Sequence, residues 1–177
     1  MKLFKSSRPV TFCFALAFML AASLALTLPL SGQKTGAHAD DEKAVREALT
    51  QSATGFARND LAVLNKVWAN DEALTVFEQG HANYGWADYR DNHLVPEMRE
   101  MKNTKYELSD MRVRLAGNTA WATFKYAISA DVDKRHIDGG GLGTAVLEKR
   151  DGRWQIMHWH SSAPRRAPAA AAPAKKS

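Results

Sequence analysis

Apolar residues recur at three- and four-residue spacing in the first half of the chain, after an apolar N-terminal run. This spacing predicts a helix from Asp40 or Asp41 to about Arg58, capped by one of the two aspartates. A second, short helix is predicted from Asn59 or Asp60, where a side-chain oxygen again precedes an apolar stripe. The first part of the folded chain is therefore expected to be helical.

The segment that follows is mixed. Leu74–Gln79 is short, apolar and bounded by polar residues, which indicates an extended strand. The segment 80–85 carries a glycine at each end and is expected to form a turn into a third helix, which continues to about Met101. Pro96 falls inside that helix, so we expect a kink or an early break there.

After Thr104 the periodicity changes to strict alternation. Four segments with this pattern are separated by Gly117-Asn118, by the region around Asp133-Lys134 and by Asp151-Gly152, all typical of hairpin turns. The predicted strands cover residues 106–115, 119–130, 137–149 and 153–161. Helices followed by an antiparallel meander predict an α+β domain in which a curved sheet wraps around three helices. The glycine-rich run 139–143 is expected to bend or bulge the sheet, because it lacks the ending of a phosphate-binding loop.

Charge is unevenly distributed along the 177 residues, although the formal net charge is +5. Four basic residues precede Asp40 and four follow Pro164, which leaves the central segment with 16 basic against 19 acidic side chains. A mildly acidic domain is a poor nucleic-acid partner, since phosphate binding needs clustered Lys and Arg. The basic, Pro/Ala-rich residues 163–177 are predicted to form a disordered tail.

The N-terminus has the layout of a secretory signal peptide. Basic residues precede an apolar run that is broken by Pro29, and the small-residue triplet 37–39 stands just before Asp40. We expect residues 1–39 to be removed, giving a periplasmic or secreted protein; an uncleaved membrane anchor is the alternative. The only cysteine, Cys13, lies in this segment, so cleavage would exclude disulfides and thiolate chemistry from the mature domain.

The predicted strand 119–130 is apolar on both faces. We assign Trp121, Thr123 and Lys125 to the face that lines a cavity. The alternate residues Phe124, Tyr126 and Ile128 then form an outer aromatic stripe, and burial of that stripe between subunits is the expected reason for it. The predicted partner is a second copy of the chain, as a dimer through the sheet or a larger ring.

Several segments together resemble the SnoaL-like group of the nuclear transport factor 2-like superfamily. They are Leu74–Glu78, Gly85, Tyr89-Arg90 and the closing segment Asp151–Ser162, and the resemblance covers residues 42–162. Within the group, the sequence is most similar to the association domain of calcium/calmodulin-dependent protein kinase II. The resemblance implies a cone-shaped, cystatin-like fold, a pocket between the third helix and the concave sheet, and assembly through the sheet. Of the positions that are cationic in the association-domain pocket, only Lys125 is charged here.

The candidate site centres on Glu78. The resemblance aligns it with the catalytic carboxylate of steroid isomerases, whereas the first helix has no tyrosine to serve as the oxyanion donor. From the residues alone, Glu78 is either a buried base with a raised pKa or the partner of Arg90 in a structural ion pair. The predicted ligand-binding residues are Tyr89, Arg90, His93, Trp121, Lys125 and Trp159. Lys125 is expected either to neutralise Glu78 or to hold a small carboxylate.

No cofactor and no metal site are predicted, because the spacing of the histidines does not require them to converge. The expected function is binding of a small apolar or weakly acidic molecule, or assembly, in an exported protein without assigned catalysis. The alternative is an isomerase or hydratase that uses Glu78 as general base.

Overall fold

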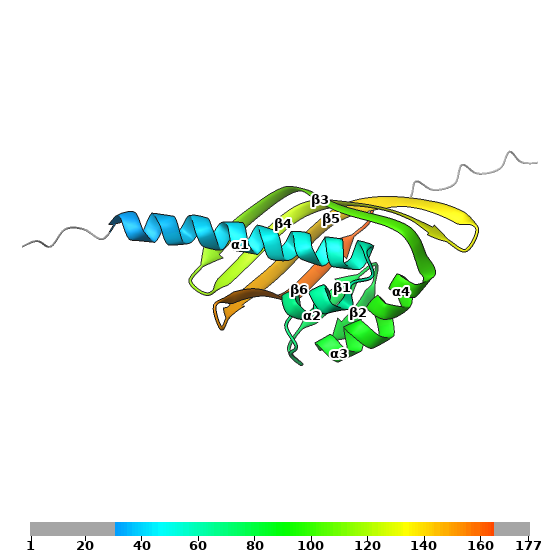
Figure 1. Cartoon of the computed structure of the whole chain (residues 1–177), viewed down its shortest axis with the longest axis horizontal. Coiled ribbons are helices and arrows are strands. Elements are labelled where there is room, and N and C mark those ends of the chain that lie inside the picture. The colour runs from blue at the N-terminus through cyan, green and yellow to red at the C-terminus, as the bar shows by residue number, and fades with distance from the viewer. Residues whose placement is uncertain (1–30, 165–177) are drawn as a thin grey trace, which may run out of the picture.

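The computed structural model describes residues 31–164, with side chains from residue 37 onward. Helices come first and a long-stranded meander follows, which confirms the predicted α+β class (Figure 1). The elements are α1 (Ser31–Ala57), α2 (Leu61–Val67), β1 (Thr75–Glu78), β2 (His81–Tyr84), α3 (Trp86–Tyr89), the π-helical turn η1 (Arg90–Leu94), α4 (Val95–Glu100), β3 (Met101–Ala116), β4 (Thr119–Val132), β5 (Arg135–Arg150) and β6 (Arg153–Ser162).

The six strands form one sheet in the order β2-β1-β6-β5-β4-β3. Only β1 and β6 pair in parallel, which brings the end of β1 beside the end of β6. Two-residue turns join β3 to β6 in succession, as predicted, and Asp151 and Gly152 both have the positive φ that a type I′ turn requires. In Figure 1 α1 lies across one face of the curved sheet, which we call the inner face; the opposite face is the outer face.

Small side chains allow α1 to approach the sheet. Ala120, Ala122 and Ala145 are fully buried on the inner face, in the same hydrophobic cluster as Val45 and Leu49 of α1. Large side chains at these positions would hold the helix away from the sheet, because packed interiors leave little free volume. The alternation of β4 therefore places Ala120, Ala122 and Phe124 inside.

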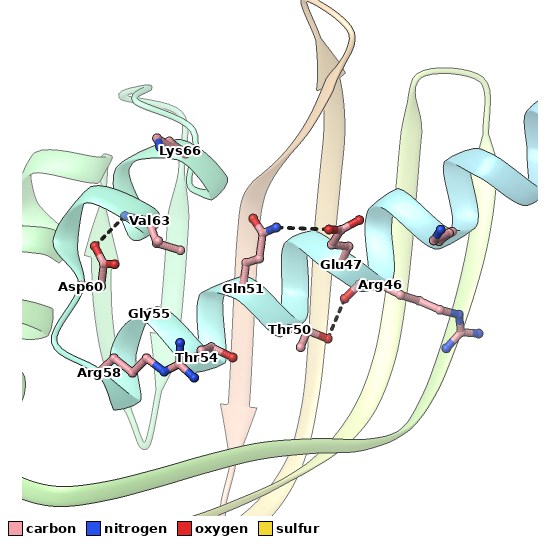
Figure 2. A pocket seen from close by; sticks show the side chains of 11 residues that line it. Arg46, Glu47, Thr50, Gln51, Thr54, Gly55, Arg58, Asp60, Val63 and Lys66 are labelled. Carbon is pink, nitrogen blue, oxygen red and sulfur yellow. Dashed lines mark hydrogen bonds between the residues drawn. The ribbon is translucent and has the colours of Figure 1, made fainter.

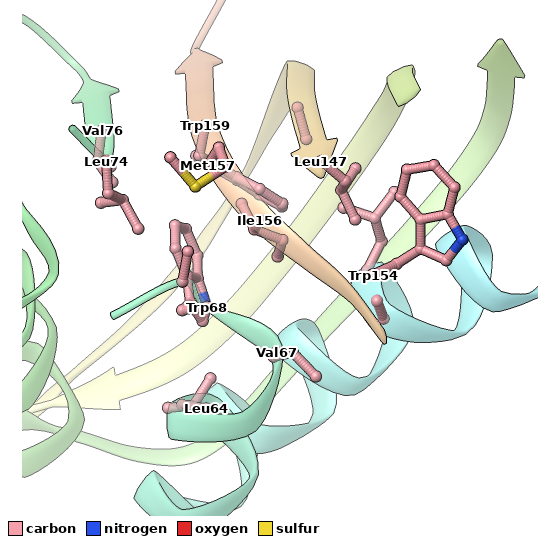
Figure 3. Packing of buried hydrophobic residues seen from close by; sticks show 14 of the residues in the cluster. Leu64, Val67, Trp68, Leu74, Val76, Leu147, Trp154, Ile156, Met157 and Trp159 are labelled. Carbon is pink, nitrogen blue, oxygen red and sulfur yellow. The ribbon is translucent and has the colours of Figure 1, made fainter. Parts of the chain in front are cut away.

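The core continues around Trp68, which ends α2. Figure 3 shows its ring among the side chains of Leu74, Met157 and Trp159. The Trp68 indole N–H donates a hydrogen bond of 2.9 Å to the hydroxyl of Ser52 in α1, so the one polar atom of this ring is satisfied inside the core. This contact ties the short helix to both the sheet and α1.

Three local expectations are corrected. The first helix begins at Ser31 rather than at Asp40 or Asp41; the carboxylate of Asp41 accepts hydrogen bonds from Lys149 and Trp154 and so does not cap the helix. The predicted turn 80–85 contains a strand, β2, paired with β1. The glycine-rich run of β5 pairs with β4 without a bulge, and it is glycine-rich partly because a Cβ on Gly143 would overlap the ring of Phe124.

The third helix is interrupted, as Pro96 predicts, but the interruption is a wide π-helical turn, η1, directly before α4. Proline has no N–H to donate to the preceding turn, so a normal α-helical turn would lose a hydrogen bond there. His93 lies in this wide turn.

The predicted signal peptide falls largely outside the described residues, and so does most of the predicted tail. Residues 37–40 belong to α1 and are exposed. Within residues 31–164, no helix is both long enough and apolar enough to cross a membrane.

Candidate functional site

The sheet places Glu78 at the end of β1, directly opposite Ser161 of β6. The Ser161 hydroxyl donates to one carboxylate oxygen of Glu78 at 3.2 Å, and the Tyr89 hydroxyl faces the other at 3.4 Å. Only 17% of the Glu78 side chain is exposed. A carboxylate is thus held on the inner face, with its two oxygens oriented by hydroxyl groups.

Burial raises the pKa of the Glu78 carboxyl above its usual 4.5, although the charge of His93 and the two hydroxyl donors oppose the shift. The guanidinium of Arg90 lies elsewhere and pairs with Asp91 at 2.7 Å. The predicted ion pair between Glu78 and Arg90 is therefore absent, and the prediction that Arg90 belongs to the site is wrong. Glu78 is therefore a largely buried carboxyl group with a raised pKa and, within the described part of the chain, without an arginine partner.

His93 is an ionisable neighbour of Glu78. Its Nε2 lies 3.6 Å from Glu78 Oε2 and 3.4 Å from an oxygen of Glu97, one helical turn further on in α4. Its Nδ1 lies 2.8 Å from the side-chain oxygen of Asn83 in β2. The interaction with Glu97 raises the pKa of the imidazole most, while desolvation lowers it.

An aromatic wall surrounds these polar groups. Tyr89 is buried between Trp68 and His93, with ring centroids 5.0 and 5.4 Å away. On the sheet, Trp159 packs against Phe124 at 4.8 Å, and Tyr106 lies edge-on to Tyr126 at 5.9 Å. The aromatic residues of this wall come from three strands, β3, β4 and β6, and from the ends of α2 and α3.

Burial raises the pKa of the Tyr106 and Tyr126 hydroxyls, and the charge of Glu78 adds to the shift. Both phenols therefore stay protonated and able to donate a hydrogen bond at neutral pH. Neither hydroxyl was predicted to belong to the site. The sequence analysis assigned Tyr126 to the outer face and treated Tyr106 only as the start of a strand.

The prediction of which β4 residues face the cavity is wrong. Trp121 is 45% exposed and Lys125 is paired with Asp110 at 2.5 Å, with more than half of both charged side chains in solvent. Both residues lie on the outer face, whereas Phe124 and Tyr126 lie inside. Lys125 therefore neither neutralises Glu78 nor holds a ligand beside it.

The structure thus brings together Glu78, Tyr89, His93 and Trp159 from the predicted set. It adds Ser161 and Asn83 as hydrogen-bond partners. Asn83 could not be found from the sequence because its segment was expected to be a turn, and the pairing of β1 with β2 is what aims it at the third helix.

A separate open groove of about 890 Å³ lies between α1 and α2 (Figure 2). It is lined by polar and charged side chains, among them Arg46, Glu47, Gln51, Arg58 and Lys66. None of the site residues above borders it, so it belongs to the solvent-facing side of the helices.

No group of three or more His, Cys, Asp or Glu side chains within residues 31–164 has the arrangement of a metal site.

A family model for the SnoaL-like domain matches residues 45–166. This chain therefore belongs to the SnoaL-like family, whose members have the nuclear transport factor 2-like fold. A search of curated proteins found no match.

Solved structures with this fold are similar over most of their length. A nuclear transport factor 2-like superfamily protein from Salmonella enterica serovar Typhimurium LT2 has a TM-score of 0.67 and 16% identity, over 77% of this chain and 99% of that one. Hexachlorocyclohexane dehydrochlorinase LinA-type3 from Novosphingobium barchaimii LL02 has a TM-score of 0.63 and 14% identity, over 76% and 94%. A protein provisionally named ketosteroid isomerase from Shewanella frigidimarina NCIMB 400 has a TM-score of 0.60 and 22% identity, over 67% and 94%. At these identities the likeness shows the fold alone.

Proposed function

We propose that this protein is an enzyme that removes a proton from carbon in a small, uncharged organic molecule, with Glu78 as the general base. The observation that carries the proposal is a largely buried carboxylate whose ionic neighbour is a histidine and not an arginine or lysine. A structural carboxylate in a core is usually neutralised by a fixed cation. A base needs a raised pKa and a partner that can itself accept or release a proton.

The names of two similar structures support this class of reaction. One is a dehydrochlorinase and the other a provisionally named isomerase. Elimination and isomerisation next to a carbonyl or halide can both begin with removal of a proton from carbon by a positioned base. Glu78 supplies the base that such a step requires.

The second requirement is a donor to the negative charge that develops on the substrate. We propose Tyr126 for this role, because its hydroxyl is protonated at neutral pH and its ring lies on the inner face of the sheet. Tyr89 is less suitable, since its hydroxyl faces Glu78 itself. The expected sequence is proton transfer from carbon to Glu78 while Tyr126 donates to the substrate oxygen.

The surroundings of Glu78 indicate the substrate class. The wall is aromatic, and the ionisable neighbours of Glu78 are His93 and the carboxyl of Glu97. An anionic substrate would be repelled by these carboxylates. A neutral cyclic ketone or a similar apolar carbon acid fits better.

Deuterium exchange provides a direct test. A panel of cyclic ketones in D₂O is incubated with wild type, Glu78→Gln and Arg90→Gln, and loss of the C–H signals is followed by NMR. We expect wild type to accelerate exchange, Glu78→Gln to lose about 10²- to 10⁴-fold of the rate, and Arg90→Gln to keep it. Wild type without exchange on any compound, or an active Glu78→Gln, would contradict the proposal.

We also propose self-association through the outer face. Trp121, Leu142, Phe77 and Tyr84 expose 45%, 62%, 37% and 64% of their surface. Sheet register places two of these residues, Tyr84 and Trp121, at the two ends of one row that crosses five strands through Thr75, His158 and Val146. A second copy of the same face would cover them.

Light scattering tests this contact. Trp121→Arg is expected to reduce the particle mass, because an interface would have to bury an unpaired charge. Arg58→Glu, which alters charge on the α1–α2 side, serves as the control and is expected to leave the mass unchanged. A monomeric wild type, or an unaltered mass in Trp121→Arg, would remove the support for this contact.

Export remains our proposal from the N-terminal pattern, with cleavage after Ala39. Residues 37–40 are exposed, and Asp41 is the residue whose side chain ties this part of α1 to the sheet. Cleavage after Ala39 would leave the contacts of Asp41 intact. Intact mass of the exported protein is expected to begin at Asp40, and a retained Met1 would indicate the membrane anchor instead.

A further inference from the structure

We infer that Asn83 locks one tautomer of His93, so that His93 Nε2 carries a proton between the base Glu78 and the more exposed Glu97. This inference deepens the proposed function and rests on it for its catalytic meaning. The proton positions themselves follow from hydrogen-bond geometry, and they can be tested without a substrate.

The orientation of the Asn83 amide is fixed by Asp88. The Asn83 Nδ2 donates to Asp88 Oδ2 at 3.1 Å. An ionised carboxylate can only accept a hydrogen bond, so the amide nitrogen of Asn83 must be the atom that faces Asp88. The amide oxygen must then be the atom that faces His93, and it lies 2.8 Å from Nδ1. Asp88 is itself held by donors from Asn92 and from the backbone N–H of Tyr84, at 2.9 and 3.0 Å.

An amide oxygen accepts but does not donate, so Nδ1 must carry a proton. The neutral form of His93 in this setting therefore has a bare Nε2. That nitrogen lies 3.6 Å from a Glu78 oxygen and 3.4 Å from a Glu97 oxygen. An unprotonated Nε2 between two ionised carboxylates would be unfavourable, because the lone pairs of the nitrogen and the oxygens repel one another. One proton is therefore shared among Glu78, His93 Nε2 and Glu97.

Exposure differs along this row of groups. The Glu78 and His93 side chains are 17% exposed, whereas Glu97 is 39% exposed. When Glu78 takes a proton from carbon, His93 Nε2 can first release its own proton to Glu97, which meets solvent, and then accept the proton from Glu78. Each step breaks one O–H or N–H bond and forms another, and no atom is oxidised or reduced. The base is returned to its ionised form without opening the aromatic wall.

The other groups that face His93 do not replace this path. Tyr89 presents a ring at 5.4 Å and keeps its proton at neutral pH, since burial raises its pKa well above 10. His81 of β2 presents a ring at 6.2 Å and is exposed. Asp88 contacts Asn83 and acts on His93 through its charge as well, so within residues 31–164 the two glutamates are the ionisable groups paired with Nε2.

The experiment is a ¹⁵N NMR titration of the histidine rings in the full chain, with His93 assigned from His93→Gln. In wild type the Nδ1 shift is expected to stay that of a protonated nitrogen at every pH, with only Nε2 titrating. In Asn83→Ala the lock is lost, and His93 is expected to change to the tautomer protonated at Nε2 when it is neutral. Asn92→Ala removes a neighbouring bond to the same Asp88 without touching His93, and is expected to behave as wild type.

Glu97→Gln and Glu78→Gln complete the test. Each is expected to lower the pKa of His93, because each removes a negative charge beside Nε2. A wild-type His93 that is protonated at Nε2 when neutral, or one whose pKa does not respond to either variant, would overturn the inference. These outcomes are independent of the deuterium-exchange assay, which tests the proposed reaction.

Discussion

The two faces of β4 are built from alternate residues of one strand, yet they have different chemistry. The inner face carries alanines and the rings of Phe124 and Tyr126, and it leads to the carboxylate of Glu78. The outer face carries Trp121 and Lys125, which are 45% and 61% exposed. Aromatic content therefore does not identify the buried face; the small residues that admit α1 do.

The largest expected effect separates two adjacent residues. Phe124 is 3% exposed and packs on Trp159, so Phe124→Ala should lower the free energy of unfolding by about 3–5 kcal/mol. Lys125→Ala, one residue on, removes an exposed ion pair and should leave the urea midpoint nearly unchanged. Equal effects of the two substitutions in urea unfolding would mean that the faces are not as described.

The assignment of these faces shows where sequence reasoning succeeds and where it stops. Apart from β2 and the π-helical turn η1, the element types followed from periodicity, and all three hairpin turns followed from turn residues such as Gly117 and Asp151, because these signals are local. Which β4 residues point inward depends on the side of the sheet that α1 covers. That packing is a tertiary contact between residues far apart in the chain. The fully buried Ala120, Ala122 and Ala145 were the available signal for it.

The site was predictable to a similar degree. Glu78, Tyr89 and His93 were found because they end an apolar strand or share a helix face. Their mutual geometry depends on the π-helical turn before Pro96 and on a strand, β2, that the sequence pattern did not reveal. Ser161 reaches Glu78 only through parallel pairing of β1 with β6, which no local pattern encodes.

The second prediction concerns the stability cost of keeping Glu78 on the inner face. Its pKa in the folded state is raised above 4.5. Between pH 4.5 and the folded-state pKa, the folded protein binds more protons than the unfolded protein. The free energy of unfolding therefore falls as the pH rises through this range. Glu78→Gln removes this penalty. We expect the variant to have a higher urea midpoint than wild type at pH 8 and nearly the same midpoint at pH 4.

The comparison with Asp110 on the outer face sharpens this test. Hydrogen bonding to Lys125 lowers the pKa of Asp110, so the sign is reversed and its contribution is lost as pH falls through the folded-state value. Asp110→Asn should not raise the midpoint at pH 8. If Glu78→Gln lowered the midpoint at pH 8, Glu78 would be a stabilising group and not a strained base.

The smallest expected effect lies at the edge of the inner face, where Asp41 holds α1 to the sheet. A chain beginning at Asp40 should match the full chain in urea midpoint, since residues 37–40 are exposed. A chain beginning at Glu42 loses the acceptor for Lys149 and Trp154 and should be less stable by on the order of 1 kcal/mol. Equal midpoints for the two truncated chains would show that Asp41 does not anchor the helix.

The measurement that most directly tests Glu78 as a base is a ¹³C NMR titration of the glutamate carboxyl groups, with Glu78 assigned from Glu78→Gln. The inner-face burial predicts that Glu78 titrates above the usual value of 4.5. We also expect its pKa to rise further in His93→Gln, because the opposing charge of the imidazolium is removed. A Glu78 that titrates at or below 4.5 in wild type would contradict its assignment as a strained, buried base.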